Sequence, residues 1–311
     1  MTTTSSATSA PNKIASNVLE AARRIEENSR TRLRFRRAQV LRVSVLTPRM
    51  RRITLGGPDL AGFGATGSGS ERIKLGFPQP GAPVVLPEWT PNGWKYPAGA
   101  PELAIRAYTV RAWRPDVTEL DVDMVLHEHG PGGRFAATAR PGDEVGVAGP
   151  GPDYARADDA PWHLIAGDET ALPAISTILA TLPAGARAYV FVEVADAAEE
   201  QPLASPADLT VTWLHRDGDE PGTGGRLPAA IRAFTWPEGS PHTWVAGETA
   251  AVRDIRRYLR FERGLPKESV QVYGYWRRGL DGHRLAEEAA AKMRSALARG
   301  IDPNDLEDLH V

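Results

Sequence analysis

The chain has 311 residues, a net charge of −2 and no cysteine, so it is long enough for two domains. The missing cysteines exclude a disulfide framework, a cysteine nucleophile and a cysteine-bound iron–sulfur cluster, and the balanced charge disfavours a dedicated nucleic-acid binder. No apolar run reaches 18 residues and the polar start leads into no signal sequence, so we expect a cytoplasmic protein without stable membrane insertion.

The first half of the chain predicts a β-barrel. A polar leader comes first, with a short helix expected over residues 16–29 because apolar residues recur there at helical spacing. Six strand candidates without an intervening helix then predict a closed antiparallel six-stranded barrel. The Gly- and Pro-rich stretch 78–101 is expected to be a long loop. The strand candidates are 35–46, 51–55, 72–77, 104–113, 120–127 and 144–148.

The pattern changes after Pro152, where apolar strands alternate with helices. This alternation predicts a parallel sheet covered by helices on both faces, an α/β domain of the kind that binds nicotinamide coenzymes. The expected strands are 162–166, 188–194, 209–214, 242–246 and 269–275, and the expected helices are 170–182, 227–234 and 249–261, with an Ala-rich C-terminal helix over 284–299. The predicted fold is thus an α+β two-domain protein with segments 1–31, 32–152, 153–280 and 281–311.

The segment RAYTVR at 106–111 carries the first chemical signal. On a strand, Arg106 and Tyr108 share one face and Thr109 lies on the other. An arginine fork suits a pyrophosphate and a tyrosine ring suits a flavin, so the pair predicts a flavin site. An ordinary barrel strand with a surface arginine is the alternative.

The segment HEHGPGGRF at 127–135 ends a strand with three glycines around a proline, and a helical turn is expected from Phe135. Such a turn lets backbone N–H groups approach phosphate oxygens, although a flexible hairpin loop also explains it. His127 and His129 lie two residues apart, which suits a strand surface better than a metal site, so no metal site is expected.

Two further segments lie in the second half. GDETALPA at 167–174 places a polar loop at the carboxyl end of the first parallel strand, where nucleotides bind in such folds. Thr170 is expected to be the helix N-cap, and a well-capped turn without a ligand is the alternative. YGYWRRG at 273–279 ends the last strand with aromatics that either meet a flavin or nicotinamide ring or cap the core.

Together, and in this order, these segments resemble the siderophore-interacting protein family, flavin-dependent ferric siderophore reductases related to the ferredoxin–NADP reductase superfamily. PGDEVGVAGPG at 141–151 and VAGE at 245–248 also match, and the resemblance covers roughly residues 32–280. It implies an FAD domain, an NAD(P)H domain and reduction of a ferric siderophore. GPGGRF stands where many members carry a Ser or Thr and a Trp.

The resemblance also implies binding residues, and no residue is assigned a catalytic role. Two basic residues, Lys74 and Arg277, match positions that meet an anionic siderophore complex. The cofactor-binding residues are Arg106, Tyr108, Thr109, Val125, His127, Gly130, Gly132, Gly133, Arg134, Phe135 and Thr138 on the barrel side, and Asp168, Glu169, Thr170, Ala171, Glu248, Tyr275 and Trp276 on the coenzyme side.

The expected reaction has a simple electron count. A hydride carries two electrons and ferric iron accepts one, and a flavin passes electrons singly. Hard oxygen ligands bind Fe(III) better than Fe(II), so reduction loosens the complex. Glu193 and Asp196 suit a ribose 2′-hydroxyl whereas His215 and Arg216 suit a 2′-phosphate, and NADH is expected over NADPH.

Two alternatives remain open. One is a flavin reductase that serves a ferredoxin or flavodoxin. The other is a non-catalytic siderophore or nucleic-acid binder, because residues 30–52 hold nine arginines. Arg32, Arg34 and Arg36 alternate along an expected strand, which favours a solvated barrel face. The protein is expected to be a monomer or a weak oligomer.

Overall fold

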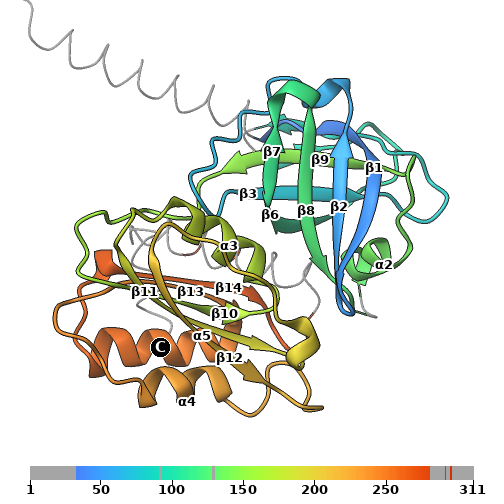
Figure 1. Ribbon diagram of the computed structural model, residues 1–311. Helices are drawn as coiled ribbons and strands as arrows, with labels where there is room; N and C mark the ends of the chain where they lie inside the picture. The colour runs from blue at the N-terminus through green and yellow to red at the C-terminus, as the bar shows by residue number, and fades with distance from the viewer. Residues whose placement is uncertain (1–32, 91–92, 128–129, 281–290, 292–294, 296–311) are drawn as a thin grey trace, which may run out of the picture.

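The computed structural model describes residues 33–90, 93–127, 130–280, 291 and 295, and it contains two β-sheets side by side, each with its own helices (Figure 1). The expected helix 16–29 and most of the expected helix 284–299 lie outside the described residues, as does His129. The strands of the two sheets fall within 36–151 and 163–276. The four segment boundaries given above stay predictions.

The first sheet is antiparallel and has seven strands rather than the six expected. Its strand order is β6-β3-β9-β1-β2-β8-β7, and no ladder joins the two outer strands among the described residues, so the expected closed barrel is wrong. The strands are β1 (Arg36–Thr47), β2 (Met50–Gly56), β3 (Arg72–Phe77), β6 (Ala104–Thr109), β7 (Ala112–Arg114), β8 (Glu119–Val125) and β9 (Glu144–Gly151). The expected loop 78–101 contains a small hairpin, β4 (Glu88–Thr90) and β5 (Gly93–Lys95).

The seventh strand arises because the predicted strand 104–113 is split. The backbone N–H of Val110 bonds to the carbonyl of Glu71 beside β3, whereas the next N–H, of Arg111, bonds to the carbonyl of Asp121 in β8. The chain therefore passes between β6 and β7 from one edge strand of the sheet to the opposite edge strand. A period-two pattern reports only which face a side chain occupies, so it does not reveal this change of partner.

The second sheet is parallel with strand order β12-β11-β10-β13-β14, as the alternation predicted. Helix α3 covers one face and α4 and α5 cover the other (Figure 1). The strands are β10 (His163–Asp168), β11 (Arg187–Val194), β12 (Asp208–His215), β13 (His242–Glu248) and β14 (Val270–Trp276). The helices are α3 (Leu172–Thr181), α4 (Arg226–Ala233) and α5 (Thr249–Arg257), which continues as a π-helical turn (Tyr258–Glu262). No helix among the described residues is long and apolar enough to cross a membrane.

Three of the arginines at the start of the first sheet are paired with acids. Arg34 precedes β1, so the expected strand alternation does not extend back to it. Ion pairs between strands of the sheet support a solvated sheet face rather than a phosphate-binding surface. These pairs are Arg37–Glu144 at 2.6 Å, Arg42–Glu119 at 2.7 Å and Arg52–Asp123 at 2.7 Å.

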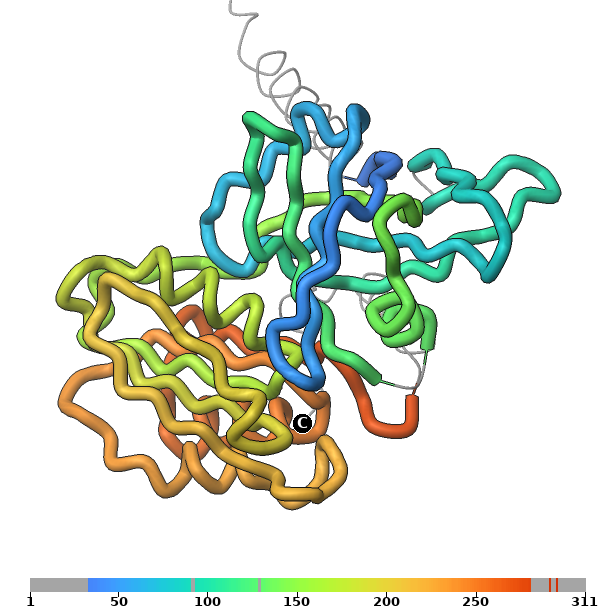
Figure 2. Tube along the Cα trace, turned by 45° about the vertical axis from the view of Figure 1, so that its right-hand side comes forward, coloured from blue at the N-terminus to red at the C-terminus, as the bar shows by residue number. Residues whose placement is uncertain are grey.

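The turn between β1 and β2 connects the two sheets, and its tip reaches the second sheet (Figure 2). The side chain of Met50 is 1% exposed and packs in the core beneath α3. The carboxylate of Glu199 accepts hydrogen bonds from the Thr47 hydroxyl at 2.6 Å and from the Arg49 N–H at 2.9 Å. A residue of the first sheet is thus part of the core of the second.

Truncating Met50 therefore tests the contact between the sheets. We expect Met50→Ala to lower the free energy of unfolding by about 2–5 kcal/mol, because it leaves a cavity in the second core. Val45→Ala is the matched control, since Val45 lies on β1 and is 71% exposed, and it should cost less than about 0.5 kcal/mol. Urea denaturation measures both, and equal losses would contradict the burial of Met50 between the sheets.

Candidate functional site

Two of the predicted segments, 106–111 and 127–135, meet at the open edge of the first sheet. Arg106 and Tyr108 lie opposite Leu75 and Ile73 on β3, so both side chains are on one face of the edge strand β6. The Tyr108 hydroxyl lies against Gly132 in helix α2 (Gly130–Thr138), where an added Cβ would be 2.1 Å from it. The RAYT strand and the glycine-rich segment are therefore in direct contact.

The end of β8 joins the same contact. A Cβ on Gly133 would lie 2.2 Å from the carbonyl oxygen of His127 and 2.7 Å from its ring. The glycines are thus required by close approach of Tyr108 on one side and His127 on the other. The expected helix start at Phe135 is wrong, because α2 already begins at Gly130, which has a φ of 78°.

Several predicted residues of this region point elsewhere. Thr109 is buried and lies on the opposite face of β6 from Tyr108. Phe135 packs on Phe77 with ring centroids 5.0 Å apart, and Thr138 donates to the Arg134 carbonyl at the far end of α2. Val125, at the end of β8, pairs with Met50 on β2, and the Arg134 side chain is exposed to solvent.

Arg106 is the cation available at this edge. Its guanidinium donates to the carbonyl of Ile105 at 2.8 Å, and no acidic side chain pairs with it among the described residues. Burial raises the pKa of Tyr108 well above its ordinary value, so the phenol stays neutral at physiological pH. An unneutralised arginine beside a neutral aromatic ring suits a ligand with a phosphate group and a flat ring system.

At the carboxyl edge of the second sheet, Asp168 joins three strands. One carboxylate oxygen accepts from the N–H and hydroxyl of Thr170, and the other accepts from the Glu248 N–H at 2.9 Å and the Trp276 indole at 2.8 Å. Thr170 is therefore not the helix N-cap that was predicted, and Ala171 occupies that position without a side-chain bond. Asp168 fixes the strand ends β10, β13 and β14 relative to one another.

Two further carboxylates, of Glu169 and Glu193, surround the buried Arg216. Arg216 is 2% exposed and forms a two-pronged ion pair with Glu169 at 2.6 and 2.7 Å, and it lies 3.7 Å from Glu193. Glu248 instead caps α5 by accepting from the N–H groups of Ala250 and Ala251. The structure thus brings Asp168, Glu169 and Glu248 to one edge, but most of their oxygen atoms are already bonded to the protein.

The aromatic residues at the end of β14 are partly buried. Tyr275 packs against Trp244 with ring centroids 6.3 Å apart, and burial raises its pKa well above the ordinary value. The Trp276 ring lies over Gly222, where an added Cβ would be 3.0 Å from it. Both side chains contact the protein core or a neighbouring loop.

The two predicted siderophore-binding residues lie apart from Tyr108. Lys74 pairs with Ala107, so its side chain is on the face of β3 and β6 opposite to Tyr108. Burial lowers its pKa, and Arg72 lowers it further. Asp153, which sequence analysis missed, lies 3.3 Å from Arg72, and burial raises its pKa to about 6. Arg277 follows β14 in a turn closed by a bridge to Leu280.

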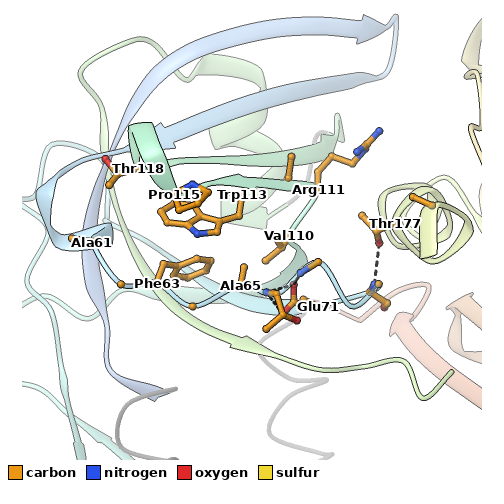
Figure 3. A pocket seen from close by; sticks show the side chains of 18 residues that line it. Ala61, Phe63, Ala65, Glu71, Val110, Arg111, Trp113, Pro115, Thr118 and Thr177 are labelled. Carbon is orange, nitrogen blue, oxygen red and sulfur yellow. Dashed lines mark hydrogen bonds between the residues drawn. The ribbon is translucent and has the colours of Figure 1, made fainter. Parts of the chain in front are cut away.

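A cavity of about 720 Å³ lies elsewhere, between the first sheet and α3 (Figure 3). The rings of Phe63 and Trp113, with centroids 5.2 Å apart, form one wall, and Thr177 on α3 accepts from the Ser70 N–H on another. Its carboxylate, Glu71, is bonded to the N–H groups of Thr66 and Gly67. None of the predicted cofactor or siderophore residues lines this cavity.

Comparison with known proteins agrees with this architecture. Residues 39–154 match the siderophore-interacting FAD-binding domain, and residues 160–279 match the siderophore-interacting protein domain. The chain belongs to the siderophore-interacting protein family. Within this family it is 36% identical to ferric vibriobactin reductase of Vibrio cholerae over 252 residues, covering 80% of this chain and 91% of that protein.

Two further relatives and one distant structure extend the comparison. The NADPH-dependent ferric-chelate reductase of Escherichia coli is 32% identical over 256 residues, covering 81% of this chain and 97% of that protein. A siderophore utilization protein from T. fusca is 42% identical with a TM-score of 0.72, covering 81% of this chain and 97% of that one. A ferredoxin reductase of carbazole 1,9a-dioxygenase shares the fold at 15% identity and a TM-score of 0.56, covering 78% and 69%.

The contact between Tyr108 and α2 predicts a compensating pair of substitutions. Gly132→Ala should cost about 1–3 kcal/mol of stability and lower flavin content, because the new Cβ meets the phenol oxygen. Adding Tyr108→Phe removes that oxygen and leaves the nearest atom of that ring at 3.4 Å, so stability should return. Thermal unfolding of both single variants and the double variant measures the coupling. A double variant as unstable as Gly132→Ala would contradict the contact.

Asp168 predicts a pH dependence. Burial raises its pKa to about 6, with Glu169 adding to the rise, whereas an unfolded aspartate has a pKa of about 3.9. The folded protein therefore holds this proton more tightly, so the group's contribution to the free energy of unfolding falls as pH rises from about 4 to about 6 and is constant above. Carboxyl ¹³C NMR, assigned with Asp168→Asn, measures the midpoint. A midpoint near 4 would show that the four hydrogen bonds outweigh burial.

Proposed function

We propose that this protein is an FAD-dependent reductase that passes electrons from a nicotinamide coenzyme to a ferric siderophore. The observation that carries the proposal is the meeting of β6, the end of β8 and α2 around Tyr108, in a chain whose relatives are named ferric reductases. The residues fit FAD: the Arg106 fork has no acidic partner among the described residues and suits a pyrophosphate, and the neutral ring of Tyr108 beside it suits a flat ring system.

When bound, FAD would accept a hydride and pass electrons on singly. The protein's part is positioning. Arg106 would orient the phosphates and the neutral ring of Tyr108 would lie along the flavin, while Asp168 holds the strand ends beside which the coenzyme would bind. Lys74 and Arg277 are proposed to attract an anionic siderophore complex, and the iron would leave as Fe(II) because its oxygen ligands hold it less tightly.

The test is the visible spectrum of the purified protein under anaerobic conditions. We expect the visible absorbance of a bound flavin. NADH should bleach this absorbance and a ferric hydroxamate should restore it, while a ferrous-specific dye detects the Fe(II) that is released. A spectrum restored by ferredoxin but not by ferric chelates would favour a reductase that serves a protein partner. A colourless preparation that binds the chelate would contradict the enzyme and favour a siderophore-binding protein.

We propose NADH as the preferred coenzyme. Arg216 is the arginine placed to attract a 2′-phosphate, but Glu169 and Glu193 already surround it, and His215 is bonded to Glu200 at 2.8 Å. A dianionic phosphate would meet this acidic surrounding without a free cation. The Escherichia coli relative is named NADPH-dependent, so the preference would differ within the family.

Releasing Arg216 should weaken the preference. In the natural protein we expect kcat/KM to be higher with NADH than with NADPH. Glu169→Gln should lower the ratio of these two kcat/KM values about tenfold, or about 1.4 kcal/mol, because it frees the Arg216 guanidinium. Asp254→Asn is the matched control, because it removes a carboxylate from an exposed ion pair with Arg232 that joins α4 to α5. A natural protein that prefers NADPH tenfold would contradict the proposal.

A further inference from the structure

We propose that Glu199 is a positioning residue that holds the coenzyme-binding sheet at a fixed spacing from the wall of the FAD site, and so sets the rate at which the coenzyme reduces the flavin. The proposal rests on the proposed function. Glu199 lies outside every motif of the sequence, and its role follows from what its carboxylate contacts.

Both oxygens of Glu199 are used by the other sheet. The residue follows β11 in a short 3-10 turn (Ala197–Glu199), which is fixed by the Asp196 side chain accepting from the Ala198 N–H at 2.9 Å. Glu199 is 4% exposed and has no cationic partner among the described residues. Among the described residues, the donors to its carboxylate are the Thr47 hydroxyl and the Arg49 N–H, and hydrogen bonds to a carboxylate are short and directional.

The turn that Glu199 holds is also bonded to the FAD wall. The carbonyl of Arg49 accepts from the Leu126 N–H at 2.8 Å, one residue before His127. The carbonyl of His127 in turn lies against Gly133 of α2. A continuous series of contacts thus leads from the end of β11, through the β1–β2 turn, to the helix beside Tyr108.

Hydrophobic contact alone would not fix this spacing. Met50 gives the two sheets a shared core, but burial of apolar surface has no preferred direction and permits sliding. The hydrogen bonds of Glu199 set the register at the β1–β2 turn, and the bond from the Ser70 N–H to Thr177 on α3 is a second, separate contact between the two halves. Hydride transfer needs reacting atoms about 3–3.5 Å apart, and a displacement of about 1 Å costs roughly a hundredfold in rate.

The experiment separates the two half-reactions. In stopped-flow measurements, Glu199→Ala should slow flavin reduction by saturating NADH about tenfold to a hundredfold, while flavin content and reoxidation by ferric hydroxamate stay unchanged. Thr47→Val removes one of the two bonds and should give a smaller effect. Glu199→Gln should restore the rate, because its amide oxygen accepts from Arg49 and its amide nitrogen donates to the Thr47 hydroxyl.

A measurement on the protein without FAD or coenzyme tests the spacing directly. The chain has no cysteine, so spin labels can be attached at cysteines introduced for the exposed residues Val117 and Arg253, one beside each sheet. We expect the distance distribution between the labels to broaden in Glu199→Ala and to stay narrow in Glu199→Gln.

Three results would overturn the proposal. One is a lower melting temperature in Glu199→Ala with an unchanged reduction rate and label distance. Another is an equal loss in both half-reactions. If Glu199→Ala does not fold, an unchanged reduction rate and label distance in Thr47→Val decide against it. A natural protein whose flavin neither NADH nor NADPH reduces would refute the proposed function instead, and the label distances would still report whether Glu199 fixes the spacing.

Discussion

The carboxylate of Glu199 is buried between two β-sheets, and both of its oxygens accept hydrogen bonds from the sheet that does not carry it. Beside it, Met50 of the first sheet completes the core of the second. These contacts set the relation between the edge strand β6 with α2 and the carboxyl ends of β10, β13 and β14. A site assembled from both sheets depends on that relation, because neither sheet contains all the predicted residues.

Charge is distributed differently on the two sides of the candidate site. On the coenzyme side, each buried charge is bonded within the protein: Asp168 accepts four hydrogen bonds and Arg216 is held by Glu169. Arg106, on the flavin side, has no acidic partner among the described residues. A buried charge is costly unless it is bonded, so Asp168 and Arg216 are paired within the protein, whereas Arg106 is the cation that we propose meets a phosphate.

The order of motifs in the sequence was enough to place the chain in its family, and short-range periodicity was enough to find the parallel sheet. Local signals were less reliable wherever a second partner competed. Thr170 has the chemistry of an N-cap, yet it donates to Asp168 instead. The glycines of α2 suggested a flexible turn, but they are helical residues that Tyr108 and His127 approach closely.

By itself the sequence determined the residue types available, the alternation of apolar and polar positions, and hence an antiparallel sheet followed by a parallel one. Only the tertiary structure decided that the first sheet stays open, because the backbone changes partner between Val110, which bonds to Glu71, and Arg111, which bonds to Asp121. The tertiary structure also decided which charged side chains have an oppositely charged partner. The partners of Glu199 are about 150 positions away, and no local pattern encodes a hydrogen bond across that separation.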